Sequence, residues 1–162
     1  MRVTRWMAPL ALVAGLLFTS TARAQSAQCE VTVIHAQHNG DDGREPEIDP
    51  QIHRLKGYLM KAPFTAWREF KLLERNELTL QEKGSSEFVL PNGREAELTF
   101  VSHSAGPGDH RLRLQMTIED KGKKSQMLNT TFVLDEGGVV LLVGQKYQAG
   151  VLILGVSCKT HD

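Results

Sequence analysis

The sequence has few of the features by which protein function is usually recognised. Only two of its 162 residues are cysteines, and aromatic residues make up 6% of the chain. It contains no G-x-S-x-G, H-E-x-x-H or P-loop motif. The formal net charge is zero. These absences exclude a strongly basic nucleic-acid-binding protein and leave no recognised catalytic signature.

The first residues of the chain are typical of a secretory signal peptide. Arg2 and Arg5 precede an apolar stretch at Met7–Phe18, which is too short to span a bilayer, and Ala22-Arg23-Ala24 is a small-x-small cleavage site. We therefore expect residues 1–24 to be removed and the mature domain to run from 25 to 162, in the periplasm or outside the cell. An uncleaved N-terminal anchor is the alternative.

Cleavage would leave a single domain that is mildly acidic. It removes three of the 19 basic residues (Arg2, Arg5 and Arg23) and none of the 19 acidic ones, so the net charge becomes 16 − 19 = −3. The sequence has no second long apolar run. We therefore expect no membrane span after processing and no nucleic-acid partner.

The two cysteines, Cys29 and Cys158, lie near the two ends of the mature chain. In an exported protein, an isolated pair is most simply a disulfide. Two free thiols are the alternative. The pair lacks the C-x-x-C spacing that is common in redox-active sites.

Period-two alternation of apolar and polar residues predicts that most of the chain is β-structure. Acidic residues alternate with apolar ones at 95–100, and arginines do so at 111–118. If these strands pair, their outer charges should oppose one another. The apolar runs at 139–143 and 151–156 favour strands that are buried on both faces or covered by a partner. Further strands are expected at 29–36, 70–81, 87–90 and 127–134.

One short helix is expected near the N-terminus of the mature domain. Asp49 can cap it, Pro50 suits its first turn, and Pro63 bounds it. The sequence thus predicts a mostly β fold. We expect an antiparallel β-sandwich-like domain of seven or eight strands with one short N-terminal helix, in preference to a closed barrel.

The stretch IHAQHNGDDG contains the residue types of a metal site. His35, His38, Asp41 and Asp42 could supply nitrogen and oxygen ligands to zinc, and the acidic loop 37–48 could bind calcium. On an extended strand, however, residues three apart point to opposite faces. A strand end followed by a solvated turn therefore remains the alternative.

Two other places could meet a ligand or a partner. His103 and His110 flank a hairpin tip, and the alternation places His103 on the outer face with Glu95 and Glu97. Tyr147 lies in the loop between the two most apolar strands and is a candidate partner-binding residue. The aromatic residues at 64, 67 and 70 are more simply core residues that join the helix to the sheet.

The stretch WREFKLLERNELTLQEKGSSEFVLPNGREAELTFV and the closing TTFVLDEGGVVLLVGQKYQAGVLIL resemble a group of short exported β-rich bacterial proteins. The resemblance implies a β-rich envelope protein and carries over no catalytic residue. Together with the absent motifs, it favours a non-enzymatic exported domain that binds or scaffolds other envelope components. The alternative is a metal-binding protein that uses the segment from His35 to Asp42, with zinc or calcium as the ion.

Overall fold

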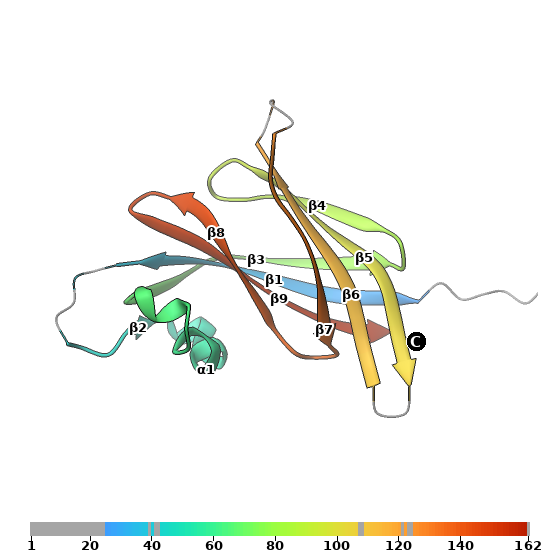
Figure 1. The fold of residues 1–162 in the computed structure, drawn as a ribbon, viewed down its shortest axis with the longest axis horizontal. Coiled ribbons are helices and arrows are strands. Elements are labelled where there is room, and N and C mark those ends of the chain that lie inside the picture. Colours follow the sequence, from blue (N-terminus) through green and yellow to red (C-terminus); the bar gives the residue numbers. More distant parts are fainter. Residues whose placement is uncertain are drawn as a thin grey trace, which may run out of the picture.

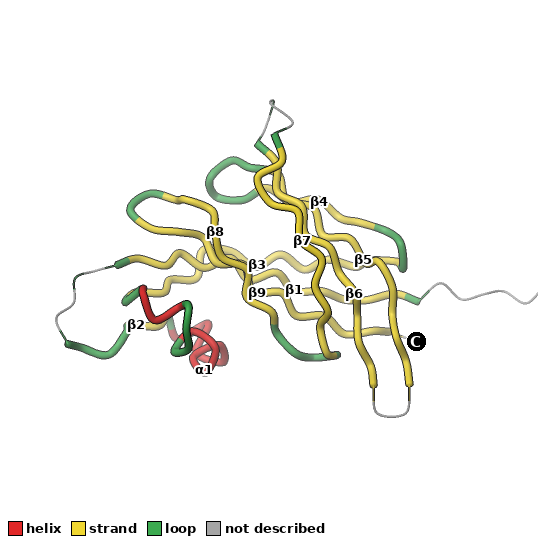
Figure 2. The backbone as a smooth tube through the Cα atoms, in the orientation of Figure 1, coloured by secondary structure: helices red, strands yellow, loops and turns green. Residues whose placement is uncertain are grey.

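The computed structural model describes residues 25–38, 40, 43–106, 109–120, 122 and 125–161. The predicted signal peptide lies outside these residues. Two β-sheets face each other, and a short helical segment lies to one side of the first (Figures 1 and 2). The predicted fold class, a mostly β, sandwich-like domain with one short helix, is confirmed.

Sheet A has five strands in the order β2-β3-β1-β9-β8. β2 pairs in parallel with β3, and all other neighbours in this sheet are antiparallel. The first and the last long strands of the chain therefore lie side by side in its interior (Figure 1). The strands are β1 (Ser26–Gln37), β2 (Glu47–Ile48), β3 (Glu69–Gln81), β8 (Val140–Tyr147) and β9 (Gly150–His161).

Sheet B is an antiparallel meander of four strands in the order β4-β5-β6-β7. The turn formed by Pro91, Asn92 and Gly93 joins the first two strands, as the sequence predicts, and Gly93 has a φ of 79°, which favours glycine. The strands are β4 (Ser85–Val89), β5 (Glu95–Gly106), β6 (Asp109–Glu119) and β7 (Gln126–Asp135).

The main hydrophobic core lies between the two sheets, and side chains of every strand except β2 enter it or pack against it. The predicted alternation in β6 is confirmed, because its four inward apolar side chains are all 0% exposed. β9 is buried on both faces over much of its length, as its apolar run predicts. β8 is an edge strand with half-buried side chains. The inward residues of β6 are Leu112, Leu114, Met116 and Ile118.

A second core lies on the other face of sheet A, where the helical segment packs. Asp49 caps this segment, since its Oδ1 accepts a hydrogen bond from the Gln51 backbone N–H at 2.9 Å. The segment is a 3₁₀ helix, η1 (Pro50–Leu55), followed by one α-helical turn, α1 (Lys56–Leu59). It is shorter than a regular helix and depends on packing for its stability. A further 3₁₀ turn, η2 (Phe64–Ala66), follows it.

The second core combines the helical segment with the outward side chains of the central strands. Phe64 is buried in this cluster, and Trp67 packs against it half-buried, as expected for aromatic residues that join the helical segment to the sheet. The buried residues of the cluster are Ile34, Ala36, Ile52, Leu55, Leu59, Phe64, Phe70 and Ile153.

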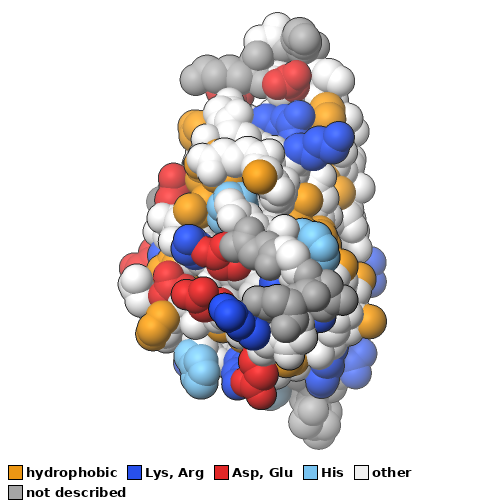
Figure 3. Space-filling model, turned by 90° about the vertical axis from the view of Figure 1, so that its left-hand side faces the viewer, with side chains coloured by type: hydrophobic (Ala, Val, Ile, Leu, Met, Phe, Trp, Pro, Cys, Tyr) orange, Lys and Arg blue, Asp and Glu red, His pale blue; other side chains and the backbone are white. Residues whose placement is uncertain are grey.

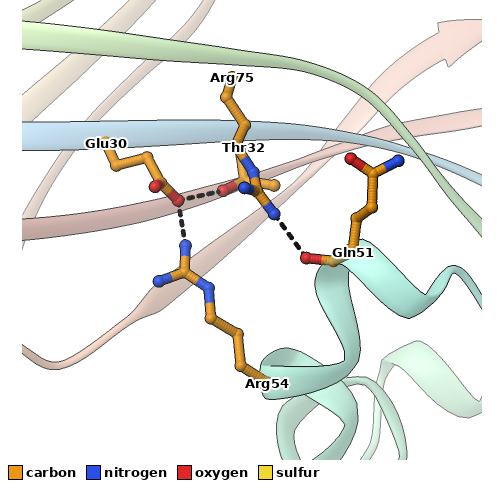
Figure 4. A network of polar contacts seen from close by, with 5 residues as sticks. All are labelled: Glu30, Thr32, Gln51, Arg54 and Arg75. Carbon is orange, nitrogen blue, oxygen red and sulfur yellow. Dashed lines mark hydrogen bonds and ion pairs between the residues drawn. The ribbon is translucent and has the colours of Figure 1, made fainter.

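Polar contacts hold the helical segment onto sheet A at the margin of the second core. Glu30 accepts hydrogen bonds from the guanidinium of Arg54 and from the hydroxyl of Thr32 (Figure 4). Arg75 donates to the backbone carbonyl of Gln51 (Figure 4). Each of the two contacts to the helical segment joins a strand of sheet A to η1, so the segment is attached by both apolar and ionic groups.

The predicted disulfide between Cys29 and Cys158 is present. The two cysteines are directly opposite each other on the neighbouring strands β1 and β9. Both are buried, at 3% and 1% exposure, on the side of sheet A that faces the main core. A disulfide between two strands can join neighbours in one sheet or strands that face each other across the core. Here it joins neighbours in sheet A.

The predicted pairing of outer charges between β5 and β6 is wrong. The register places Glu95 opposite Glu119 and Glu97 opposite Thr117, whereas the arginines of β6 lie opposite Ser102 and Ser104. Because the strands are antiparallel and join at a tight hairpin, residues near the tip pair only with each other. The acidic residues of β5 and the arginines of β6 therefore lie at opposite ends of the pair.

Among the described residues, no helix is both long enough and apolar enough to cross a membrane.

Candidate metal-binding site

A β-bulge in β5 decides where His103 points. Phe100 pairs with Leu114, but Ser102 pairs with Arg113, so Val101 is an extra residue in its strand. The bulge reverses the alternation beyond it. His103 is therefore opposite Leu112, a core residue, and the prediction that it lies on the outer face is wrong. Its side chain is half-buried at the end of the main core.

The hairpin brings His103 and His110 onto the same face of sheet B. His110 is opposite Ala105, two residues beyond the pair that contains His103. Such diagonal neighbours are within reach of long side chains. The two imidazole rings are nearly parallel, with centroids 6.1 Å apart and an interplanar angle of 24°.

The third residue of the site, Glu136, lies in the turn where the chain passes from sheet B to sheet A. This turn connects β7 to β8. Gly137 has a φ of 75°, which favours glycine. The backbone N–H of Glu136 donates to the carbonyl of His110 at 3.0 Å, and that of Gly137 donates to the carbonyl of Cys158 at 3.0 Å. The turn is therefore attached to both sheets.

Two hydrogen bonds from β9 orient the carboxylate of Glu136. Its Oε1 accepts from the hydroxyl of Thr160 at 2.6 Å and from the backbone N–H of Thr160 at 2.8 Å. These two bonds, the hydroxyl one first, lower the pKa of Glu136. Both bonds end on Oε1, which leaves Oε2 as the oxygen that can face the histidines.

A hydrogen bond to Gln25 sets the tautomer of His103. Nδ1 of His103 lies 2.9 Å from Oε1 of Gln25. An amide oxygen can only accept a hydrogen bond, so Nδ1 carries the proton and Nε2 of the neutral ring has a free lone pair. Nε2 is buried, and none of the described residues forms a hydrogen bond with it.

The three side chains bring their ligand atoms together. One nitrogen or oxygen from each of His103, His110 and Glu136 lies within 4.8 Å of the others. Tetrahedral ligands that are 2.0–2.1 Å from a zinc ion are about 3.4 Å apart, so small side-chain rotations would complete the coordination. His110 and Glu136 are exposed and have room to make them.

The histidines of the predicted metal site have separate partners. The ring of His35 is buried at 4% exposure and packs edge-on against Tyr147, with centroids 5.0 Å apart. Nδ1 of His38 lies 2.9 Å from the carbonyl oxygen of Ala66 and donates to it. Asp41 and Asp42 lie outside the described residues. Zinc or calcium binding by this segment stays a prediction.

Tyr147 is the last residue of the edge strand β8, at the β8–β9 hairpin. Its ring is half-buried, and it packs against both the main core and His35. It therefore has a role within the fold. Figure 3 views the molecule from the end where this hairpin and the helical segment lie, and there acidic and basic side chains are interspersed with small apolar areas.

Sequence reasoning found only part of this site. It identified the histidines at the hairpin tip but gave His103 the wrong face, because a single-residue bulge leaves no clear mark in the alternation. It missed Glu136, which is 26 residues from His110 along the chain and is brought to it only by the crossing between sheets. Gly137 and Gly138 are typical of a turn but carry no signal for a ligand.

The chain matches no protein-family model, and no curated protein or solved structure was found to be similar to it.

Proposed function

We propose that this protein is an exported domain that binds a divalent transition-metal ion at His103, His110 and Glu136. The observation that supports this most directly is the environment of Nε2 of His103. This nitrogen is buried and accepts no hydrogen bond from the described residues, and a ring nitrogen of His103 lies within 4.8 Å of ligand atoms of His110 and Glu136. A buried polar group left without a partner costs about 1–3 kcal/mol. A bound metal ion would remove that cost.

The composition of the site favours zinc. Two imidazoles and one carboxylate form a ligand set that zinc uses widely, whereas calcium and magnesium prefer oxygen ligands alone. Three protein ligands leave the fourth tetrahedral position for water or for a donor from another molecule. The bond that His103 donates to Gln25 and the bond that Glu136 accepts from Thr160 correspond to the outer contacts that orient metal ligands.

The export of the protein is supported by its N-terminal sequence and by its disulfide. Disulfides persist in oxidising compartments such as the periplasm and the extracellular space. Because imidazole binds metals only in its neutral form, the affinity for zinc should fall in acid. The proposed activity is therefore zinc binding in a compartment close to neutral pH.

The first experiment is a zinc titration of the exported protein, by calorimetry and by thermal melting. We expect one ion per chain. At 100 times its dissociation constant, zinc should add about 2.7 kcal/mol to the free energy of unfolding and raise the melting temperature on the order of 10 °C. The exposed ligand variant His110→Ala should lose both effects without unfolding.

Two control variants separate the alternatives. His53→Ala removes an exposed histidine outside the site and should bind zinc normally. His38→Ala tests the other histidine segment. Loss of binding in His38→Ala, with full binding in His110→Ala, would move the site to that segment. Absence of binding in the wild-type protein would refute the proposal.

A second binding role is favoured by the position of β8. It is an edge strand, and β9 is the one described strand that pairs with it, so the other side of its backbone is available to an added strand. An extended segment of another envelope protein fits such an edge. Tyr147→Ala should then reduce cross-linked recovery of this partner, while Tyr147→Phe, which keeps the ring, should not. Equal recovery with both variants, at equal stability, would exclude Tyr147 from the contact.

A further inference from the structure

The two groups that orient the metal ligands come from the two ends of the domain. Gln25, which contacts His103, directly precedes β1. Thr160, which contacts Glu136, is the second-last residue of β9. β1 and β9 are neighbours over their whole length, and Ala27 is opposite Thr160. The site therefore depends on the order of two strand ends that would otherwise tend to fray.

The disulfide joins these two strands close to the site. Cys29 is four residues from Gln25 (29 − 25), and Cys158 is two residues from Thr160 (160 − 158). Cys158 also contacts the site through its backbone, because its carbonyl accepts from Gly137, the residue after Glu136. The covalent bond thus fixes the part of sheet A from which both orienting contacts are made.

We propose that the redox state of the Cys29–Cys158 pair controls the metal affinity of this site. The inference rests on the proposed zinc binding and adds its regulation. In the oxidised protein, the strand ends hold Gln25 and Thr160 in place and zinc binds well. In the reduced protein, these ends open more often and zinc binds weakly. Loss of the outer contacts of metal ligands typically lowers affinity by about 10- to 100-fold.

The switch is a two-electron exchange with a dithiol. A thiolate of the reductant attacks one sulfur, the Cys29–Cys158 bond breaks, and a mixed disulfide forms. The second thiol of the reductant then resolves it, which leaves two protein thiols and an oxidised reductant. By reciprocity, zinc must favour the oxidised protein by the same factor by which the disulfide favours zinc.

This coupling would link metal loading to maturation. Before the disulfide forms, the site has low affinity, so the chain would not retain zinc until oxidation after export. Once loaded, zinc would protect the disulfide, since both sulfurs are buried and become accessible only when the strand ends open.

The test compares zinc affinity in the oxidised wild-type protein and in a Cys29→Ala, Cys158→Ala variant. Competition with a chromogenic chelator gives the dissociation constants. We expect the variant to bind about 10- to 100-fold more weakly. Alanine is used because it cannot re-form the disulfide during the measurement. The matched control is Leu59→Ala, which destabilises the second core on the far side of sheet A and should leave the affinity unchanged.

A third variant links the effect to the outer contacts. Thr160→Val removes the hydroxyl donor to Glu136 and should weaken zinc binding in the oxidised protein. Combined with the cysteine replacements, it should cost less than the sum of the two separate effects, because both act on the same strand end. Additive losses would show that the disulfide and Thr160 act independently, against the proposed route.

Failure of the redox control can be distinguished from failure of zinc binding itself. If the wild-type protein binds no zinc, the proposed function fails. If the wild-type protein and the cysteine variant bind equally, only the redox control fails. Should the variant not fold, the wild-type protein is reduced with a water-soluble phosphine, which takes up oxygen from water as the disulfide becomes two thiols. Zinc should slow this reduction, and an unchanged rate would overturn the inference.

Discussion

Replacing Cys29 and Cys158 with alanine is expected to lower the free energy of unfolding by about 2–5 kcal/mol. The disulfide spans 129 residues of sequence, so in the unfolded chain it closes almost the whole domain into one loop. In the chain-entropy treatment, the stabilisation grows with the length of the loop and approaches about 5 kcal/mol here. This contribution is a large share of the free energy of unfolding of a domain of this size.

The measurement is urea unfolding of both proteins, each without added metal so that zinc binding does not contribute. The midpoint should fall, and the m-value should rise slightly because the variant exposes more surface when it unfolds. Wild-type protein reduced with phosphine gives the same comparison without changing a side chain. A loss below about 1 kcal/mol in both would mean that the unfolded chain is already restricted by other contacts.

Replacing Phe100 with alanine is expected to cost about 3–5 kcal/mol. The ring is 0% exposed and lies in the core between the two sheets. Phe100 is opposite Leu114 and immediately precedes the bulge that turns His103 inward. Closely packed sheets cannot collapse easily around the missing ring, so the loss includes a cavity as well as the transfer of apolar surface.

The matched control is Val133→Ala, on the outer face of the same sheet. Val133 is 47% exposed, and its truncation should change the stability by less than about 0.5 kcal/mol. Both values come from urea unfolding of the metal-free proteins. Similar losses for the two variants would contradict the placement of the main core on the inner face of sheet B.

These measurements separate metal binding, which needs His110, from core packing, which needs Phe100. His110→Ala removes a ligand and should leave the stability without metal nearly unchanged, since the side chain is exposed. Phe100→Ala should lower the stability with or without metal. Zinc should therefore partly rescue Phe100→Ala if the site survives, and it should not affect His110→Ala.

Local patterns in the sequence predicted most of the architecture. The alternation in β6 follows from the requirement that one face of a strand is buried, and the packing of the two sheets satisfies it. Asp49 and Pro50 marked the start of the helical segment because capping is a local interaction. The disulfide was predictable from the number of cysteines and the expected export of the protein, although the sequence left open whether the two strands are neighbours.

The candidate site was predictable only in part, because its members meet through long-range pairing. The position of His103 depends on one extra residue at Val101, and a shift of one residue moves every later side chain to the other face. Glu136 reaches the histidines only because the chain crosses between sheets at that point. Neither the bulge nor the crossing between sheets leaves a periodic signal in the sequence, and both are set by how the two sheets pack.

The amino-acid sequence by itself determined the β-rich class, the disulfide partners and the helical cap, because each depends on residue type and short spacing. The tertiary structure decided which strands are neighbours, that β8 lies at an edge, and that the arginines of β6 are far from the acidic residues of β5. It also assembled His103, His110 and Glu136 from two separate segments. Register and sheet packing are properties of the whole chain, and they place residues that no local pattern connects.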